Sequence, residues 1–313
     1  MAYEAEWFQK LSEEQNPLVS KQDYVVIDSE RIRRRVRKNN FLKQVFLLLT
    51  SLGIVVLGIL LYQIVVQSIG WLDWSFLVSR LSINADKAGI LGAILGTVWL
   101  MLIVIPVTIV LGVSTAIYLE EYARPGKLQS FIKTNLSNLA SVPSVIFGLL
   151  GLTVFSRLMG LGSSILAGGL TLSLLVLPIV VVSSQEAIRA VPGFLRDASY
   201  AMGASRWITI WKVVLPVALP GILTGSILAV SRAIGETAPL VVLGIPTLIL
   251  MYPTNIMSDF TALPIQIYYW TLDTVLTKEY ANLAAATIVV LLLVLFVMNS
   301  LAIVIRQKFQ KKF

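Results

Sequence analysis

Long apolar runs separated by short charged segments dominate the chain. Six runs lack Asp, Glu, Lys and Arg, except that the fifth contains Arg232 and Glu236; they span residues 44–72, 89–119, 134–156, 158–185, 213–244 and 280–305. A helix needs about 20 residues to cross the roughly 30 Å hydrocarbon core of a bilayer. Strands of a membrane β-barrel would be nearer ten residues long, with an alternating polarity that these runs lack. The pattern therefore predicts an all-α membrane protein with six transmembrane helices.

The uncharged segment 237–258 is long enough to suggest a further span. Pro246 and Pro253 interrupt it, however, and Thr254 and Asn255 make it more polar. We predict that its first part ends the fifth helix and that the rest forms an external loop. The aromatic segment that follows, 260–272, is short and fits an interfacial or loop helix.

Basic residues are distributed unevenly between the two sides that six spans would create. Twenty of the 25 lysines and arginines fall in or next to the two tails and in segments 119–133 and 186–212, four fall on the other side, and Arg232 is the remaining one. Because basic residues accumulate on the cytoplasmic side, both termini are predicted to be cytoplasmic. No apolar run follows the initiator closely, so a cleaved secretory signal is not expected.

These boundaries divide the chain into four parts. They are a polar N-terminal tail (1–40), a first transmembrane helix (41–72), a larger transmembrane region (89–306) that contains the loop 186–216, and a short basic tail (307–313).

Composition narrows the possible chemistry. Apolar residues make up 57% of the chain and charged residues only 13%, against about a quarter charged in a water-soluble domain. Cysteine and histidine are both absent, which excludes disulfides, thiolate metal sites and the commonest metal ligand. We therefore expect no catalytic residues and no metal site. The basic cluster at 31–38 fits an anchor on anionic lipid headgroups rather than a nucleic-acid site.

The loop 186–216 is long for a simple connection between two spans. Pro192 and Gly193 form a turn signal, and apolar residues then mix with Arg196, Asp197, Arg206 and Lys212. Such a mixture predicts short amphipathic helices beneath the membrane. Gly203 would allow a close turn between them.

This loop resembles the cytoplasmic motif of permease subunits in ABC importers. That motif has an acidic-small-small triplet, a glycine four residues after its first position, and an aliphatic-x-Leu-Pro ending. The matching residues here are Asp197, Ala198, Ser199, Gly203, Leu215 and Pro216. Asp197 and Ser199 depart mildly from the usual Glu-Ala-Ala triplet but keep its charge and size. The resemblance implies that the loop is the coupling segment, which docks on a cytoplasmic ATPase.

Arg232 and Glu236 are the two charges inside an apolar run. A charge at the centre of a membrane costs roughly 2.5–3.5 kcal/mol on insertion scales. Their i, i+4 spacing places both on one helix face. Either this face, with the adjacent Thr237, lines or gates a pathway in which Arg232 offers a guanidinium fork to an oxyanion, or the pair is structural and fixes helix packing. Pro239 is predicted to bend or break the helix.

A second polar notch interrupts the third run. Ser141 and Ser144 flank Pro143, which disrupts helix hydrogen bonding. The two hydroxyls either satisfy the freed backbone groups or face a substrate route.

Two strings make the resemblance more specific. SRAIGETAPL (231–240) and ALPIQIYYW (262–270) are similar to the PstA-type permeases of high-affinity phosphate importers. The sister PstC type shares the Arg-Ala-x-Gly-Glu-Thr core but usually lacks the following Ala-Pro-Leu. The resemblance covers about residues 70–306 and implies a type I importer permease in the bacterial inner membrane, spanning it several times.

The same resemblance implies a set of partners and a task. A sister permease of the PstC type would complete the pathway, two ATPases of the PstB type would bind ATP and Mg²⁺, and an extracytoplasmic binding protein of the PstS type would deliver phosphate. In this chain Gly126-Lys127 has neither a glycine-rich approach nor a following Ser or Thr, so no phosphate-cradling ATP site is expected. Two alternatives remain: a permease for molybdate, sulfate or an amino acid, and a secondary transporter or channel that acts alone.

Overall fold

The computed structural model describes residues 29–246, 249 and 251–309, and these residues are almost entirely helical. Most of the predicted tail 1–40, and Lys311 and Lys312 of the basic tail, lie outside the described residues. The elements are α2 (Ser29–Ser68), α3 (Trp74–Val78), η1 (Ala85–Lys87), α4 (Leu91–Ile117), η2 (Tyr118–Tyr122), α5 (Lys127–Leu139), α6 (Ser144–Leu150), η3 (Gly151–Leu158), α7 (Ile165–Arg189), α8 (Gly193–Ala201), α9 (Arg206–Thr209), η4 (Ile210–Val214), α10 (Leu215–Gly235), α11 (Ala238–Val242), α12 (Leu263–Asp273) and α13 (Glu279–Phe309).

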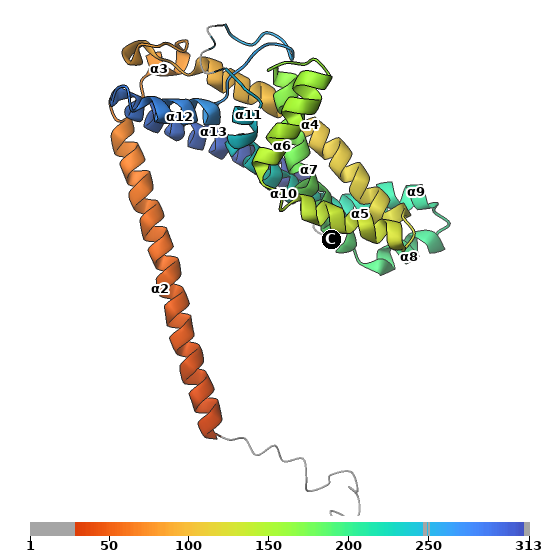
Figure 1. Ribbon diagram of the computed structural model, residues 1–313. Coiled ribbons are helices and arrows are strands. Elements are labelled where there is room, and N and C mark those ends of the chain that lie inside the picture. Colours follow the sequence, from red (N-terminus) through yellow and green to blue (C-terminus); the bar gives the residue numbers. More distant parts are fainter. Residues whose placement is uncertain (1–28, 247–248, 250, 310–313) are drawn as a thin grey trace, which may run out of the picture. The chain divides into compact units, whose positions relative to one another are not determined.

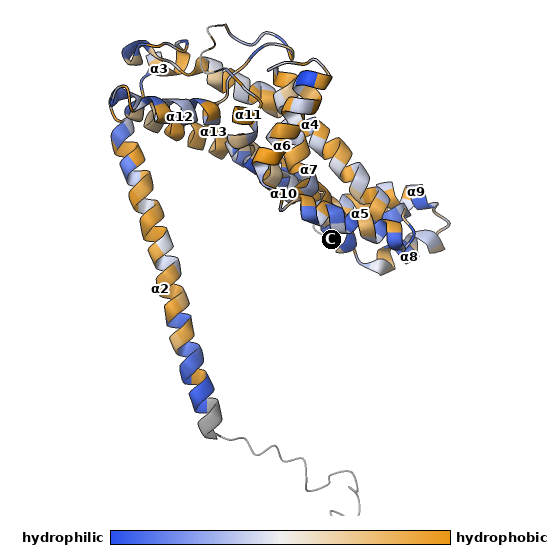
Figure 2. Ribbon diagram, viewed as in Figure 1, coloured by the Kyte–Doolittle hydropathy of each residue, from blue (hydrophilic) through white to orange (hydrophobic). Residues whose placement is uncertain are grey.

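Two compact units divide the chain, Met1–Leu61 and Tyr62–Phe313. The first contains most of α2, whose apolar middle follows a hydrophilic stretch at its start (Figure 2). The most apolar 18-residue window of α2 has no buried residue within the chain. By length and composition α2 can cross a membrane.

Three long helices form the centre of the second unit. α4 and α10 both pack along α7, which is the most buried of the candidate spans (Figure 1). Small residues allow this close approach: a side chain at Gly112 would collide with Val180 of α7, and one at Gly225 would collide with Ser183. Gly168 and Gly169 of α7 likewise leave room for Phe260 and for Ile103 of α4.

Five helices are long and apolar enough to cross a membrane, and a sixth span results only if one bent pair of helices counts as one crossing. That pair is α5 with α6 and η3, and it bends by 106°. The predicted third span, 134–156, is therefore not one continuous helix. Pro143 lacks the amide hydrogen that a continuous helix needs, and the break at 140–143 lies at this residue.

The predicted fifth span also ends earlier than expected. α10 stops at Gly235, and α11 begins only at Ala238, with Pro239 in its first turn. Proline is well placed in a first helical turn, where its missing amide hydrogen has no intrahelical partner. The prediction that Pro239 marks a break is confirmed, and the helix of the predicted run 213–244 is interrupted at 236–237.

The short helix predicted within 260–272 is present as α12, but the first part of this segment is not interfacial. Residues 260–266 are all buried, and Phe260 lies against Leu100 and Gly168 of the two neighbouring helices. Glycines at positions 96 and 168 leave the room for it, since a side chain at either would collide with Thr261 or Phe260. Thr97 fixes the segment by accepting a hydrogen bond from the amide of Leu263 at 3.0 Å. This stretch is thus part of the core rather than of the surface.

Candidate functional site

The only two charges of the fifth apolar run contact each other. Nε of Arg232, on the last turn of α10, donates to Oε1 of Glu236 at 3.1 Å. Arg232 keeps 43% of its side chain exposed, whereas Glu236 keeps 17%. Within the described part of the chain, the terminal nitrogens Nη1 and Nη2 have no hydrogen-bond partner. The guanidinium therefore has a free two-pronged edge.

The depth of Arg232 follows from the packing of α10 on α7. Gly221 lies against Ala187 and Gly225 against Ser183, so the two helices run antiparallel. About two turns further along α10, Arg232 lies level with Val176, close to the middle of α7 (Ile165–Arg189). The pair is therefore near the mid-depth of a helix long enough to span a membrane.

The break after α10 brings the second polar notch into the same region. Thr237 is half-buried between α10 and α11, and its carbonyl accepts from the amides of Leu240 and Val241 at 3.1 and 3.0 Å. α11 packs against α6, where Gly148 leaves room for Pro239 and Val242. Two short helices that each begin at a break thus lie side by side.

The two serines of the notch differ in role. Ser141 donates its hydroxyl to the carbonyl of Asn138 at 3.0 Å, which satisfies one carbonyl at the end of α5. This contact favours the capping interpretation for Ser141. Ser144 is half-buried at the first position of α6, and the choice between its two predicted roles stays open.

The loop 186–216 folds as predicted into short helices, α8 and α9, joined by a turn at Gly203. Gly203 has φ of +81°, in the left-handed region. Its amide donates to Tyr200 at 2.9 Å, and the next amide, of Ala204, donates to Ser199 at 3.1 Å. These two bonds form a Schellman cap, which glycine favours because it has no side chain to strain. The direction of α8 therefore depends on Gly203.

The other motif residues of the loop fall into two groups. Asp197 and Ala198 are exposed on α8, near the exposed side chains of Phe194 and Met202. Ser199 faces inward, and its hydroxyl bonds that of buried Thr209 at 2.9 Å. Leu215 and Pro216 begin α10 and line an apolar hollow of 740 Å³ between α10 and α4. Asp197 and Ala198 are exposed, whereas Ser199, Leu215 and Pro216 are half-buried.

One charged cluster was missed by sequence reasoning. Glu120 and Glu121 of η2 are largely buried and bind cations from α5, α7 and α8. The sequence signal was two adjacent carboxylates directly after a long apolar run. Nothing in the sequence indicates which cations they meet.

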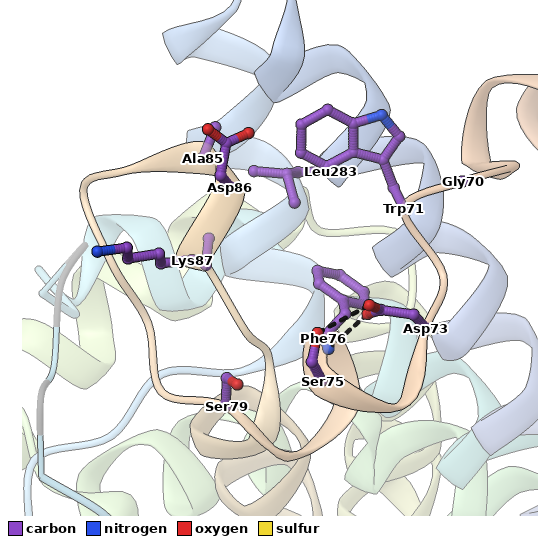
Figure 3. A pocket seen from close by; sticks show the side chains of 11 residues that line it. Gly70, Trp71, Asp73, Ser75, Phe76, Ser79, Ala85, Asp86, Lys87 and Leu283 are labelled. Carbon is purple, nitrogen blue, oxygen red and sulfur yellow. Dashed lines mark hydrogen bonds between the residues drawn. The ribbon is translucent and has the colours of Figure 1, made fainter.

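A polar hollow of 210 Å³ lies at the other end of this unit, between the segment 70–88 and α13 (Figure 3). Its Asp73 caps α3 by accepting from the amide of Phe76 and the hydroxyl of Ser75, both at 2.8 Å. These bonds lower the pKa of Asp73 below its ordinary value. Because the carboxylate is engaged as a helix cap, the hollow has a structural explanation. No cluster of three or more acidic residues that could hold a metal ion occurs among the described residues.

Comparison with known sequences and structures points to one class of proteins. Residues 108–311 match the family described as "Binding-protein-dependent transport system inner membrane component". The phosphate transport system permease protein PstA of Mycobacterium leprae is 33% identical over 284 residues, which cover 85% of this chain and 88% of that protein. The probable ABC transporter permease protein YqgI of Bacillus subtilis is 37% identical over 186 residues, 59% of this chain and 63% of that protein.

Solved structures of importers share the fold. A chain of a bacterial alginate ABC transporter, solved with a pentasaccharide-bound periplasmic protein, aligns with a TM-score of 0.59 and 17% identity over 86% of this chain and 94% of that chain. A chain of the MetNI methionine ABC transporter, in an inward-facing conformation, aligns with a TM-score of 0.55 and 19% identity. The alignment covers 69% of this chain and 94% of that chain. At these identities the likeness concerns the fold alone.

Proposed function

Because the chain belongs to the family of binding-protein-dependent transport system inner membrane components, we propose that it is a permease subunit of an ATP-driven importer for inorganic phosphate. It forms half of a translocation pathway whose other half is a sister permease of the PstC type. The assignment to phosphate is supported by relatives from Mycobacterium and Yersinia that are named as PstA phosphate permeases.

The observation that carries this proposal is the exposed arginine at mid-depth. The side chain of Arg232 is 43% exposed. If the surface around it met lipid, the charged guanidinium would lie in hydrocarbon, which costs roughly 2.5–3.5 kcal/mol. A wet pathway or a facing polar subunit avoids this cost. The free Nη1 and Nη2 edge of Arg232 suits two oxygens of a tetrahedral oxyanion. Glu236 holds the guanidinium through Nε and leaves that edge available.

Movement of this site requires an energy source outside the chain. We define the coupling loop as residues 186–216. In the proposed complex, two ATPase subunits of the PstB type bind ATP and Mg²⁺, and the ATPases contact this loop. Both termini and this loop then lie in the cytoplasm. On the opposite side, a phosphate-binding protein of the PstS type delivers the anion, and the two permeases open alternately to each side of the bacterial plasma membrane.

Reconstitution of the complex tests the proposal. With its sister permease and ATPases in lipid vesicles, and loaded binding protein on the external side, the chain should import radiolabelled phosphate only when ATP is supplied inside. Excess unlabelled phosphate should suppress the signal, whereas molybdate and sulfate should leave it nearly unchanged. Preferential uptake of molybdate, sulfate or an amino acid would replace phosphate as the substrate. Gradient-driven transport by vesicles that contain this chain alone would show a secondary transporter and contradict the proposal.

A further inference from the structure

The turn at the end of α4 is contacted by four other elements. This turn, η2 (Tyr118–Tyr122), has π-helical hydrogen bonding. Its successive residues contact different partners. The carbonyl of Leu119 accepts from Nε2 of Gln129 on α5 at 2.7 Å. The ring of Tyr122 lies 5.2 Å from the guanidinium carbon of Arg206 on α9.

Glu120 contacts two helices through one oxygen. Its Oε1 accepts from Nζ of Lys133 on α5 at 2.8 Å, and from Nε2 of Gln185 and Nη2 of Arg189 on α7 at 3.0 and 2.8 Å. The side chain of Glu120 is only 12% exposed. A single carboxylate therefore fixes the spacing of α4, α5 and α7 at this end of the unit.

Glu121 reaches the coupling loop itself. Its Oε1 accepts from Nε and Nη2 of Arg196 on α8 at 3.2 and 3.0 Å. Arg196 also donates to the carbonyls of Val191 at 2.7 Å and Ile188 at 2.9 Å, at the end of α7. The side chains of Glu121 and Arg196 are 7% and 21% exposed. One guanidinium thus joins α4, the end of α7 and α8.

This arrangement supplies a link that the chain's connectivity does not. α8 is joined covalently to α7 before it and, through α9, to α10 after it, but α4 precedes it by two elements and a bent helix pair. Within the described residues, the charged contact between Arg196 and Glu121 joins α8 directly to the end of α4. It lies beside an apolar cluster in which Leu195 of α8 packs together with Ala116 of α4. A short, partly desolvated guanidinium–carboxylate contact is stiff compared with an exposed ion pair.

We propose that η2 is a mechanical junction, in which Glu121 and Arg196 are positioning residues that make α4 move together with the coupling loop. This proposal rests on the function proposed above. When the ATPases close and displace α8, the contact draws the end of α4 along, and the bundle opens or closes as one body. Without the contact, α8 moves while α4 lags, and ATP hydrolysis no longer produces transport.

Replacing Arg196 with methionine tests the junction, because methionine keeps part of the arginine's apolar length but none of its donors. In the reconstituted complex, phosphate imported per ATP hydrolysed is expected to fall about tenfold or more, within the usual range of coupling between two sites, while ATP hydrolysis continues. Arg196→Lys keeps the charge but not the forked guanidinium, so its ratio of phosphate imported to ATP hydrolysed should lie between those of the wild type and Arg196→Met. Arg124→Met is the matched control, since Arg124 is exposed just beyond η2, and should behave as the wild type.

A cross-linking arm separates mechanical coupling from simple loss of folding. The chain has no cysteine, so Glu121→Cys with Arg196→Cys places two unique thiols at the junction, in a complex whose other subunits carry no reactive cysteine. This variant should hydrolyse ATP with poor import. A short, reductant-cleavable bis-maleimide linker between the two thiols should restore the ratio of import to hydrolysis, and cleavage should remove it again.

The outcomes distinguish the junction from the proposed function. An unchanged import-to-hydrolysis ratio in Arg196→Met, or a linked double-cysteine complex that stays uncoupled, would overturn the junction. Import of another solute by the wild-type complex would correct only the phosphate assignment, and the same ratios would be measured with that solute. ATP-independent transport by the wild type would overturn both.

Discussion

Replacing Arg232 with glutamine is expected to reduce ATP-dependent phosphate uptake by about a hundredfold while the complex still assembles. The change removes both prongs of the free guanidinium edge and the bond to Glu236. A hydrogen bond to a charged group contributes roughly 1.5–3 kcal/mol, so the loss of two to a passing anion amounts to about 3 kcal/mol, or two powers of ten in rate. Uptake of radiolabelled phosphate by vesicles that contain equal amounts of complex measures the effect.

Three companion variants separate the role of the fork from that of the charge. Arg232→Lys keeps a cation but not the fork, and should recover only part of the uptake. Arg232→Gln combined with Glu236→Gln leaves no unpaired carboxylate at mid-depth, and should remain inactive if the arginine acts on the anion. Arg157→Gln changes an exposed arginine on η3 and should leave uptake unchanged. Full uptake by the double variant would show that the pair only fixes helix packing.

Replacing Gly203 with tryptophan is expected to separate the ATPases from the permease. Every L-residue is strained at φ of +81°, and a side chain at this position meets open space within the chain. The strain costs roughly 1–2 kcal/mol and turns α8 away from its present direction. The bulky ring also projects from the exposed end of the coupling loop. We expect affinity for the ATPase to fall by at least about tenfold, with a matching loss of uptake, as measured by co-purification and transport.

Gly160 provides a matched control for this variant. It also has positive φ, at +67°, and a side chain there also meets open space, but it lies between η3 and α7 rather than in the coupling loop. Gly160→Trp should carry a similar backbone strain without loss of ATPase binding. The affinity of Gly203→Ala for the ATPase should lie between those of the wild type and the tryptophan variant, because alanine adds backbone strain with little bulk. Normal ATPase binding by Gly203→Trp would remove the docking role of this turn.

Local features of the site were predictable because they depend on neighbours in sequence. The i, i+4 spacing predicts that Arg232 and Glu236 meet on one side of a helix. The structure joins them at 3.1 Å, although Glu236 is the extended residue just after the end of α10. Pro239 predicted a break because a proline lacks an amide hydrogen, and α10 does end shortly before it. The turn at Gly203 was likewise expected from a glycine between two amphipathic stretches.

Long-range features were not predictable in the same way. Hydropathy measures whether a segment is apolar, not whether it is straight. Residues 134–156 were therefore predicted to be one transmembrane helix, whereas the chain bends by 106° at the break that contains Pro143. Residues 260–272 were predicted to form an interfacial or loop helix because their aromatic content suits a membrane surface. Gly96 and Gly168 instead open a place in the core for the first part of this segment. Partners 65 to 75 positions away, as in the contacts of Glu120 and Glu121, leave no local pattern.

The side of the membrane on which α8 lies is the most direct test of the account. Met202, at the end of α8, is 88% exposed, and a cysteine placed there would be the chain's only thiol. A membrane-impermeant maleimide should label Met202→Cys in inside-out vesicles but not in right-side-out vesicles, and Lys87→Cys, at the opposite end of the unit, should show the reverse. Labelling of Met202→Cys from the outside would place the coupling loop beyond the reach of any cytoplasmic ATPase and would contradict the account.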